Sequence, residues 1–268
     1  MEVFVNTIVT ELKASMAFVS RNFNLIKRHA GWESVFLIYT IVNTLAIGFI
    51  GWGDPDKILY LIIGSLLWGF LSVLFHDVAE AVAWERWEGT IEYTFMAPIY
   101  RLTYLVGQCS FAVLYAIFRS IIIMALVALF FKISFVNANI MATLLLIIIS
   151  SFSFLGMGLI GAVLPLLSPE KGAQATHIFQ AVILLISGVY YEVTVLPSWL
   201  RPLSVISPGT YTLRAIRKAL LENASLNELS SEIVTLILIG AFLIPFGLWV
   251  FHRAELHAKK TGKLKRSG

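Results

Sequence analysis

The chain has 268 residues, of which 58% are hydrophobic and 13% charged, and its mean hydropathy is +0.83. A soluble domain is roughly 45–50% apolar and about 25% charged, so this apolar surplus predicts burial in a bilayer as well as in a protein core. The net charge of +4 comes without a basic folded domain, which excludes nucleic acid as an expected partner. The single cysteine, Cys109, allows neither an internal disulfide nor a cysteine-rich metal site.

Residues 1–29 predict an amphipathic helix that lies along the membrane surface as an interfacial helix. Apolar side chains gather on one side of this helix, and charges such as Lys13 and Arg21 lie mostly elsewhere. These charges argue against a helix that spans the membrane. A helix packed on a partner protein would show the same pattern, and this alternative stays open.

Six apolar stretches approach the roughly 20 residues that a helix needs to cross about 30 Å of hydrocarbon. The predicted spans are residues 32–50, 58–75, 102–131, 140–164, 176–191 and 233–251. Between the last two, residues 192–231 are divided by three prolines into pieces too short to cross, which predicts a re-entrant helical hairpin. The sequence therefore predicts an all-α membrane protein with six transmembrane helices in a single domain, residues 1–268.

The distribution of cations predicts that both termini are cytoplasmic. Lysines and arginines gather in the amino-terminal helix, in the segment between spans two and three, and in the tail after the last span. Cytoplasmic loops carry such an excess, whereas long loops, such as the one after span five, count less. We therefore expect a multi-pass protein of the plasma membrane. The tail cations are Arg253, Lys259, Lys260, Lys263, Lys265 and Arg266.

The polar segment between spans two and three, residues 79–98, predicts a helix with two neighbouring faces. An aromatic face would hold Trp84, Trp87, Ile91 and Phe95, beside a stripe of Glu85, Glu88 and Glu92. Such a surface would offer a partner protein both negative charge and aromatic contact area. An acidic loop that is merely solvated is the alternative.

Signatures of catalysis are missing from the sequence. It has no phosphate loop, no H-E-x-x-H zinc helix and no G-x-S-x-G nucleophile elbow. The histidines are scattered, and none stands at ligand spacing with another histidine and a carboxylate. The sequence thus predicts no catalytic residue, no metal site and no cofactor bound by this chain.

Two segments of the sequence carry recognisable motifs. The first, between spans two and three, has the residues Glu85, Glu88, Gly89, Thr90, Glu92 and Pro98. The second runs from Ser187 to Leu200 and continues through residues 207–211 to Arg217. Both resemble motifs in the membrane subunits of ABC exporters of the ABC-2 type, which carry a glutamate and glycine-threonine pattern followed by a proline between spans two and three. In the family, this second region is the end of span five and the extracellular re-entrant helices.

The resemblance implies that residues 79–98 form a coupling helix that docks on a separate cytoplasmic ABC ATPase. The implied complex has two such ATPase subunits, which bind MgATP, and two permease subunits, expected to be identical, surrounded by membrane lipid. The expected ATPase contacts are Trp84, Glu85, Arg86, Trp87, Glu88, Gly89, Thr90 and Glu92. A second contact is expected at Ser168, Glu170 and Lys171.

By the same resemblance, spans two and five line the translocation path, which would place Phe179, Ile183 and Tyr190 near it. The apolar character of this path favours export of an amphipathic drug-like or lipid-like substrate from the cytoplasm or inner leaflet. A permease for a lipid-linked polysaccharide is the alternative within the family. A membrane-embedded enzyme or a scaffold without transport is the contrasting class.

Arg119 lies within an expected span, where an arginine costs about 2.5–3.5 kcal/mol at mid-bilayer and therefore needs a partner. About 15 residues at 1.5 Å each place it about 22 Å from Tyr104, nearer the outer face. Glu192 is the nearest acid expected at that level, so we predict an Arg119–Glu192 pair, with snorkelling to the outer headgroups as the alternative. The Arg214, Arg217 and Lys218 cluster is expected on a surface helix, or against headgroups or an anionic substrate.

Overall fold

The computed structural model describes residues 2–133 and 138–262, without the side chains of residues 2–8, 169, 170 and 173. Within these ranges the regular elements are all helices. The first six are α1 (Glu2–Arg28), α2 (Ala30–Ile50), α3 (Pro55–Glu88), α4 (Ile91–Met96), α5 (Arg101–Phe131) and α6 (Ile140–Gly161). They are followed by α7 (Val163–Leu167), α8 (Pro169–Ser187), a 3-10 turn (Val193–Val195), α9 (Arg201–Ile206), α10 (Pro208–Leu221) and α11 (Ser230–Lys260).

Five stretches of the described chain are long and apolar enough to cross a membrane: α2, α3, α5, α6 with α7, and α11. The all-α prediction is confirmed, and five of the six expected spans correspond to these helices. The fifth expected span, residues 176–191, corresponds to a shorter apolar helix, Gln174–Ser187. Helix α8 ends there because Gly188 adopts a left-handed conformation, with φ of 70°.

Helix α3 is longer than a bilayer is thick, because its 34 residues extend about 51 Å at 1.5 Å each. It starts with Pro55 after Asp54, whose carboxylate accepts the backbone N–H groups of Asp56 and Lys57. No glycine or proline interrupts the run from residue 70 to residue 88, so the second expected span and the polar segment form one continuous helix.

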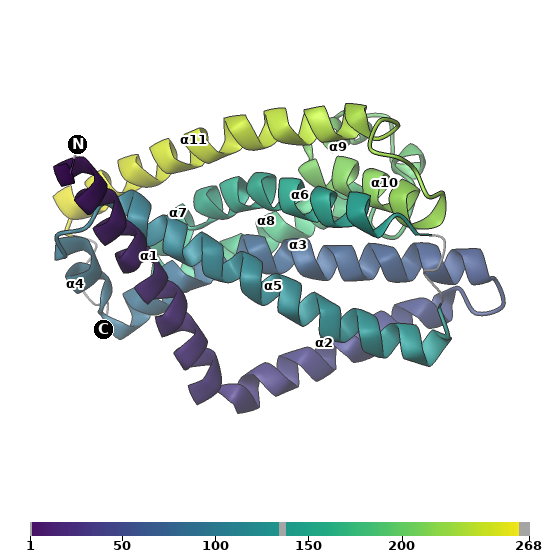
Figure 1. Ribbon diagram of the computed structural model, residues 1–268, viewed down its shortest axis with the longest axis horizontal. Helices are drawn as coiled ribbons and strands as arrows, with labels where there is room; N and C mark the ends of the chain where they lie inside the picture. Colours follow the sequence, from purple (N-terminus) through teal and green to yellow (C-terminus); the bar gives the residue numbers. More distant parts are fainter. Residues whose placement is uncertain (1, 134–137, 263–268) are drawn as a thin grey trace.

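Helix α2, at 21 residues, extends only about 31 Å. It begins well inside the end of the molecule where α4, the start of α1 and the end of α11 lie (Figure 1). We call this the arm end. Helices α3, α5 and α11 project past α2 there, whereas α9 and α10 lie at the opposite end (Figure 1).

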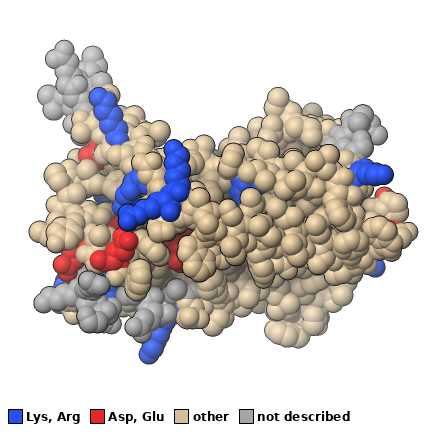
Figure 2. All heavy atoms as spheres, turned by 90° about the horizontal axis from the view of Figure 1, so that it is seen from below, with Lys and Arg blue, Asp and Glu red and all other residues tan. Residues whose placement is uncertain are grey.

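Charged side chains gather mainly at the arm end, and a broad tan surface separates them from the few at the opposite end (Figure 2). Large apolar side chains are exposed on helices from this middle zone, including Phe36, Phe118, Phe152 and Phe242. Contiguous apolar surface of this extent is unusual for a soluble monomer. It suits helices that face lipid.

The core lies between α3, α5, α6 and α11. Buried Leu71, Leu74 and Val78 of α3 pack with Ala112 of α5 and Phe154 of α6. Glycines in α6 allow neighbouring helices to approach closely. A Cβ on Gly158 would lie 3.2 Å from the Leu74 carbonyl oxygen, and one on Gly156 would lie 2.7 Å from Cβ of Leu243 on α11.

Helix α1 runs obliquely across the long axis of the bundle (Figure 1) and packs on α5. Among the described side chains of α1, Ser15, Val19 and Asn22 are buried, whereas Leu12 and Met16 are exposed. The helix, Glu2–Arg28, falls within the segment where a helix is expected, the first 29 residues. Its buried face differs from the apolar face expected from periodicity, because polar residues make part of the contact with α5.

Candidate docking surface and its supports

The polar segment between α3 and α5 turns at Gly89, which has φ of +76°. The N–H of Thr90 donates to the carbonyl of Glu85 at 2.9 Å, and that of Gly89 donates to Arg86 at 3.3 Å, so the last carbonyls of α3 are capped. Helix α4 then begins at Ile91. The single helix expected over residues 79–98 is therefore two helices, separated by a left-handed glycine.

This break changes which side chains share a surface. Trp84 and Trp87 remain exposed on α3, with ring centroids 5.3 Å apart. Ile91 and Phe95 on α4 turn inward and are buried, so they do not extend the aromatic face. Their places are taken by Tyr93 and Met96, which are 78% and 83% exposed. Sequence periodicity missed these two because it assumed a straight helix.

Among the expected ATPase contacts, the structure exposes Trp84, Trp87, Glu88, Thr90 and Glu92, and half-buries Gly89. With Tyr93 and Met96, these exposed residues form what we call the arm surface. Glu85 and Arg86 are each only 3% exposed and lie beneath it. They can support the arm surface from beneath, but they are too buried to contact a partner protein.

Glu85 is held by helix α1. Its Oε1 lies 2.8 Å from a terminal nitrogen of Arg21, whose guanidinium also lies over the Phe18 ring at 5.2 Å. Phe18 in turn contacts buried Tyr104 of α5 edge to face, with ring centroids 5.2 Å apart. This cluster ties α1, the end of α3 and α5 together directly under the arm surface.

Further polar contacts fix α1 on α5. The hydroxyl of Thr103 and the backbone N–H of Tyr100 both donate to the Glu11 carboxylate, the latter at 3.3 Å. The amide of Asn22 donates to the side-chain oxygen of Gln108. These hydrogen bonds specify one register between the two helices, which an apolar contact alone would leave less defined.

Arg101, the first residue of α5, contacts both α4 and α11. Its Nε lies 2.8 Å from Oε1 of Glu255, and its terminal nitrogens donate to the carbonyls of Thr94, at 3.3 Å, and Phe95. The guanidinium carbon lies 4.3 Å from the centroid of the Phe95 ring. The sequence indicated no role for Arg101, because its partners are distant along the chain.

The expected second contact lies in the turn between α7 and α8, toward the arm end (Figure 1). Ser168 is half-buried and Lys171 is exposed, whereas the side chain of Glu170 lies outside the described part. The turn is tightly packed, since a Cβ on Gly172 would lie 2.3 Å from the Leu164 carbonyl oxygen.

The expected path residues do not share one open surface. Phe179 is partly exposed on α8, with its ring 5.5 Å from that of Phe75 on α3. Ile183 is buried beside Phe75 and Met157, and half-buried Tyr190 follows the end of α8. The exposed residues of α8 include the apolar Ile178, Val182 and Leu185, and also Gln174 and His177.

The expected Arg119–Glu192 pair is not formed. Arg119 donates instead to the Thr40 hydroxyl at 2.6 Å and to the Phe36 carbonyl at 3.2 Å, both on α2. The prediction assumed that depth alone would bring the two charges together. Arg119 lies on the side of α5 that faces α2. Glu192 is exposed beyond the end of α8, where it interacts electrostatically with Arg217.

The basic cluster on α10 is divided. Arg217 donates to the carbonyls of Gly188, at 3.1 Å, and Val189, at 2.5 Å, and lies 3.5 Å over the Tyr60 ring. Lys218 pairs with Glu232 at 2.9 Å, and Arg214 is exposed. Two of the three cations therefore serve internal packing instead of a free surface.

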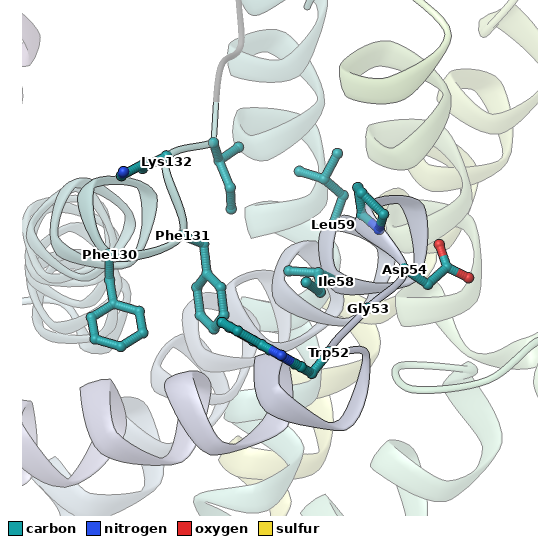
Figure 3. Close-up of a pocket in the computed structure, with 10 residues that line it drawn as sticks. Trp52, Gly53, Asp54, Ile58, Leu59, Phe130, Phe131 and Lys132 are labelled. Carbon is teal, nitrogen blue, oxygen red and sulfur yellow. The ribbon is translucent and has the colours of Figure 1, made fainter.

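The opposite end carries a pocket between the α2–α3 turn and the end of α5 (Figure 3). Trp52, Ile58, Phe130 and Phe131 make it largely apolar, with Lys132 nearby. Within the described residues, no group of three or more histidine, cysteine, aspartate or glutamate side chains is arranged to bind a metal ion.

Several helices long and apolar enough to cross a bilayer, joined by a polar segment that projects at one end, are typical of a polytopic membrane protein. The family model described as ABC-2 type transporter matches residues 14–221, and the chain belongs to that family. It is thus a multi-pass permease subunit of a transporter, from a family that normally works with an ABC ATPase and is not itself catalytic. A search of curated proteins finds no match.

Proposed function

We propose that this permease belongs to an ATP-driven exporter in which a separate ABC ATPase binds the arm surface. One observation carries the proposal: α3 continues without a break from the opposite end of the molecule to Trp87 and Glu88. A partner that displaces the arm surface would therefore tilt a helix that also crosses the membrane. ATP would be bound, with Mg²⁺, and hydrolysed by the partner.

The chemistry of the arm surface suits a protein partner. Trp87, Tyr93 and Met96 are 69%, 78% and 83% exposed, and side chains of these types are enriched at protein interfaces. Glu88 and Glu92 beside them offer negative charge, which gives register and steers association. Glu85 and Arg86 stiffen the surface from below, and Ser168 and Lys171 would add a second contact.

Two permeases, expected to be identical, would enclose the path, with two ATPases at the arm end. Phe179 and the apolar residues beside it on α8 favour an amphipathic drug-like or lipid-like substrate, taken from the cytoplasm or inner leaflet. The exposed cations Lys13, Lys27 and Arg28 of α1 favour cytoplasmic termini in the plasma membrane.

The test is to purify the permease with the ATPase encoded beside it and to measure MgATP hydrolysis in lipid. Glu88→Lys is expected to abolish the stimulation of hydrolysis by the permease while the permease itself assembles. Glu222→Lys reverses an exposed charge just after α10, toward the opposite end, and is expected to leave stimulation unchanged. Coupling that survives reversal at both Glu88 and Glu92 would refute the assignment of this surface.

A further inference from the structure

Arg101 and Glu255 form a buried ionic contact between the start of α5 and the last part of α11. Glu255 is 3% exposed, and its Oε1 lies 2.8 Å from Arg101 Nε and 2.6 Å from Lys259 Nζ. Removing a carboxylate from water is costly unless cations compensate its charge. These two cations do so, which fixes the end of α11 against the first turn of α5.

The same guanidinium holds the carboxyl end of α4. The guanidinium donates hydrogen bonds to the carbonyls of Thr94 and Phe95, and its carbon lies 4.3 Å from the centroid of the Phe95 ring. Helix α4 has six residues and no side-chain cap at its start. A helix this short is not stable alone, so its position depends on such tertiary contacts.

Only the planar fork of arginine can serve both sides at once. One edge of the guanidinium faces the Glu255 carboxylate while its terminal nitrogens reach two carbonyls of α4. A lysine at this position would keep the charge but could not hold both sets of acceptors in a fixed geometry. Arg101 is 24% exposed and lies behind α4, so it can act without touching a partner.

We propose that Arg101 and Glu255 form a clamp that makes α4 and the end of α11 move as one body. A displacement of the arm surface would then move two membrane-crossing helices. It would move α3 directly, because α3 carries part of that surface, and it would move α11 through the clamp. Arg101 is a positioning residue in this scheme. The inference rests on the proposed docking of an ATPase, but the clamp itself is testable on the permease alone.

The first experiment measures the distance between spin labels at Met96 and His252, which are both exposed, in a Cys109→Ser background in nanodiscs. The otherwise unaltered permease is expected to give one narrow distance distribution. Glu255→Gln and the charge-conserving Arg101→Lys are expected to broaden it, because α4 loses its anchor on α11. A narrow distribution in both variants would overturn the proposal.

Two matched control variants test whether the loss of any charged side chain of α11 broadens the distance distribution. Glu232→Gln neutralises another buried carboxylate of α11, which pairs with Lys218 at the opposite end, and is expected to leave the distribution narrow. Lys259→Gln removes the second cation beside Glu255 but keeps the contact with Arg101, and the distance distribution is expected to stay narrow in this variant too. Equal broadening in Glu232→Gln would show that any lost charge loosens the helix, which overturns the clamp.

The second experiment adds the ATPase encoded alongside, with MgATP and vanadate. In the otherwise unaltered protein the Met96–His252 distance is expected to stay constant on nucleotide trapping, whereas in Glu255→Gln it is expected to shift. The amount of co-purified ATPase is expected to be equal in the labelled parent and in the labelled Glu255→Gln protein, because both carry the same arm surface, including the label at Met96. A shift in the labelled parent as large as in the labelled variant would overturn the clamp, whereas failure of the ATPase to bind the unlabelled permease would instead refute the proposed function.

Discussion

The Arg21–Glu85 pair makes an asymmetric prediction about stability. The side chain of Glu85 is 4% exposed and that of Arg21 is 37% exposed, so only Arg21 can turn toward water when its partner is lost. The Tyr104 hydroxyl lies beside the Glu85 carboxylate, but it is neutral, so Arg21 is the cation that compensates the charge of Glu85. Replacing Arg21 should therefore cost much more than replacing Glu85.

The expected size follows from the cost of an unpaired buried charge. Removing one partner of a buried pair costs about 3–5 kcal/mol, and the partial exposure of Arg21 places Arg21→Met near the lower limit, about 3 kcal/mol. Glu85→Gln leaves a neutral amide beside a solvent-accessible guanidinium and should cost about 1 kcal/mol or less.

The free energies of unfolding can be compared by reversible unfolding in mixed micelles, followed by tryptophan fluorescence. The double variant Arg21→Met with Glu85→Gln should recover most of the loss in Arg21→Met, because the buried charge is gone. Equal losses in the two single variants, or an additive double variant, would refute the view that Glu85 depends on Arg21.

Other predictions concern glycines and a second arginine, and all can be measured as shifts in thermal midpoint. A Cβ on Gly64 would lie 2.1 Å from a backbone carbonyl oxygen after α8, so Gly64→Ala should destabilise the protein. A Cβ on Gly69 would meet nothing within 4 Å, so Gly69→Ala should be neutral or should stabilise the protein by up to about 1 kcal/mol. Gly89→Ala should cost about 1–2 kcal/mol because its φ is +76°, and it should also weaken ATPase coupling. Arg217→Met should destabilise by removing the donors to the end of α8, whereas the exposed control Arg214→Met should have little effect. A neutral Arg217→Met would contradict the packing role of that side chain.

The continuous α3 helix links these observations. It crosses the bundle and carries Trp84 and Trp87 near its carboxyl end, so the candidate docking surface and the membrane span share one backbone. Helix α1 braces its end through Glu85, and Arg101 fixes the neighbouring α4. Rigid attachment of this kind is what a surface needs if it is to transmit force.

Sequence alone determined the membrane class, five of the spans, the helical amino terminus and the family. These properties follow from composition, from apolar runs of bilayer length and from short motifs, all of which are local along the chain. It also placed Trp84, Trp87, Glu88 and Glu92 in one polar segment, because helical periodicity orders neighbours within a turn or two.

The tertiary structure decided which faces of those helices are covered. Glu85 is buried because α1 packs over it, Ile91 and Phe95 turn inward because Gly89 breaks the helix, and Arg119 contacts α2 instead of Glu192. Arg101 and Arg217 gain their roles from carbonyls and carboxylates contributed by other elements. Periodicity gives the direction of a side chain around its own helix, but the identity of what lies opposite depends on how distant segments pack.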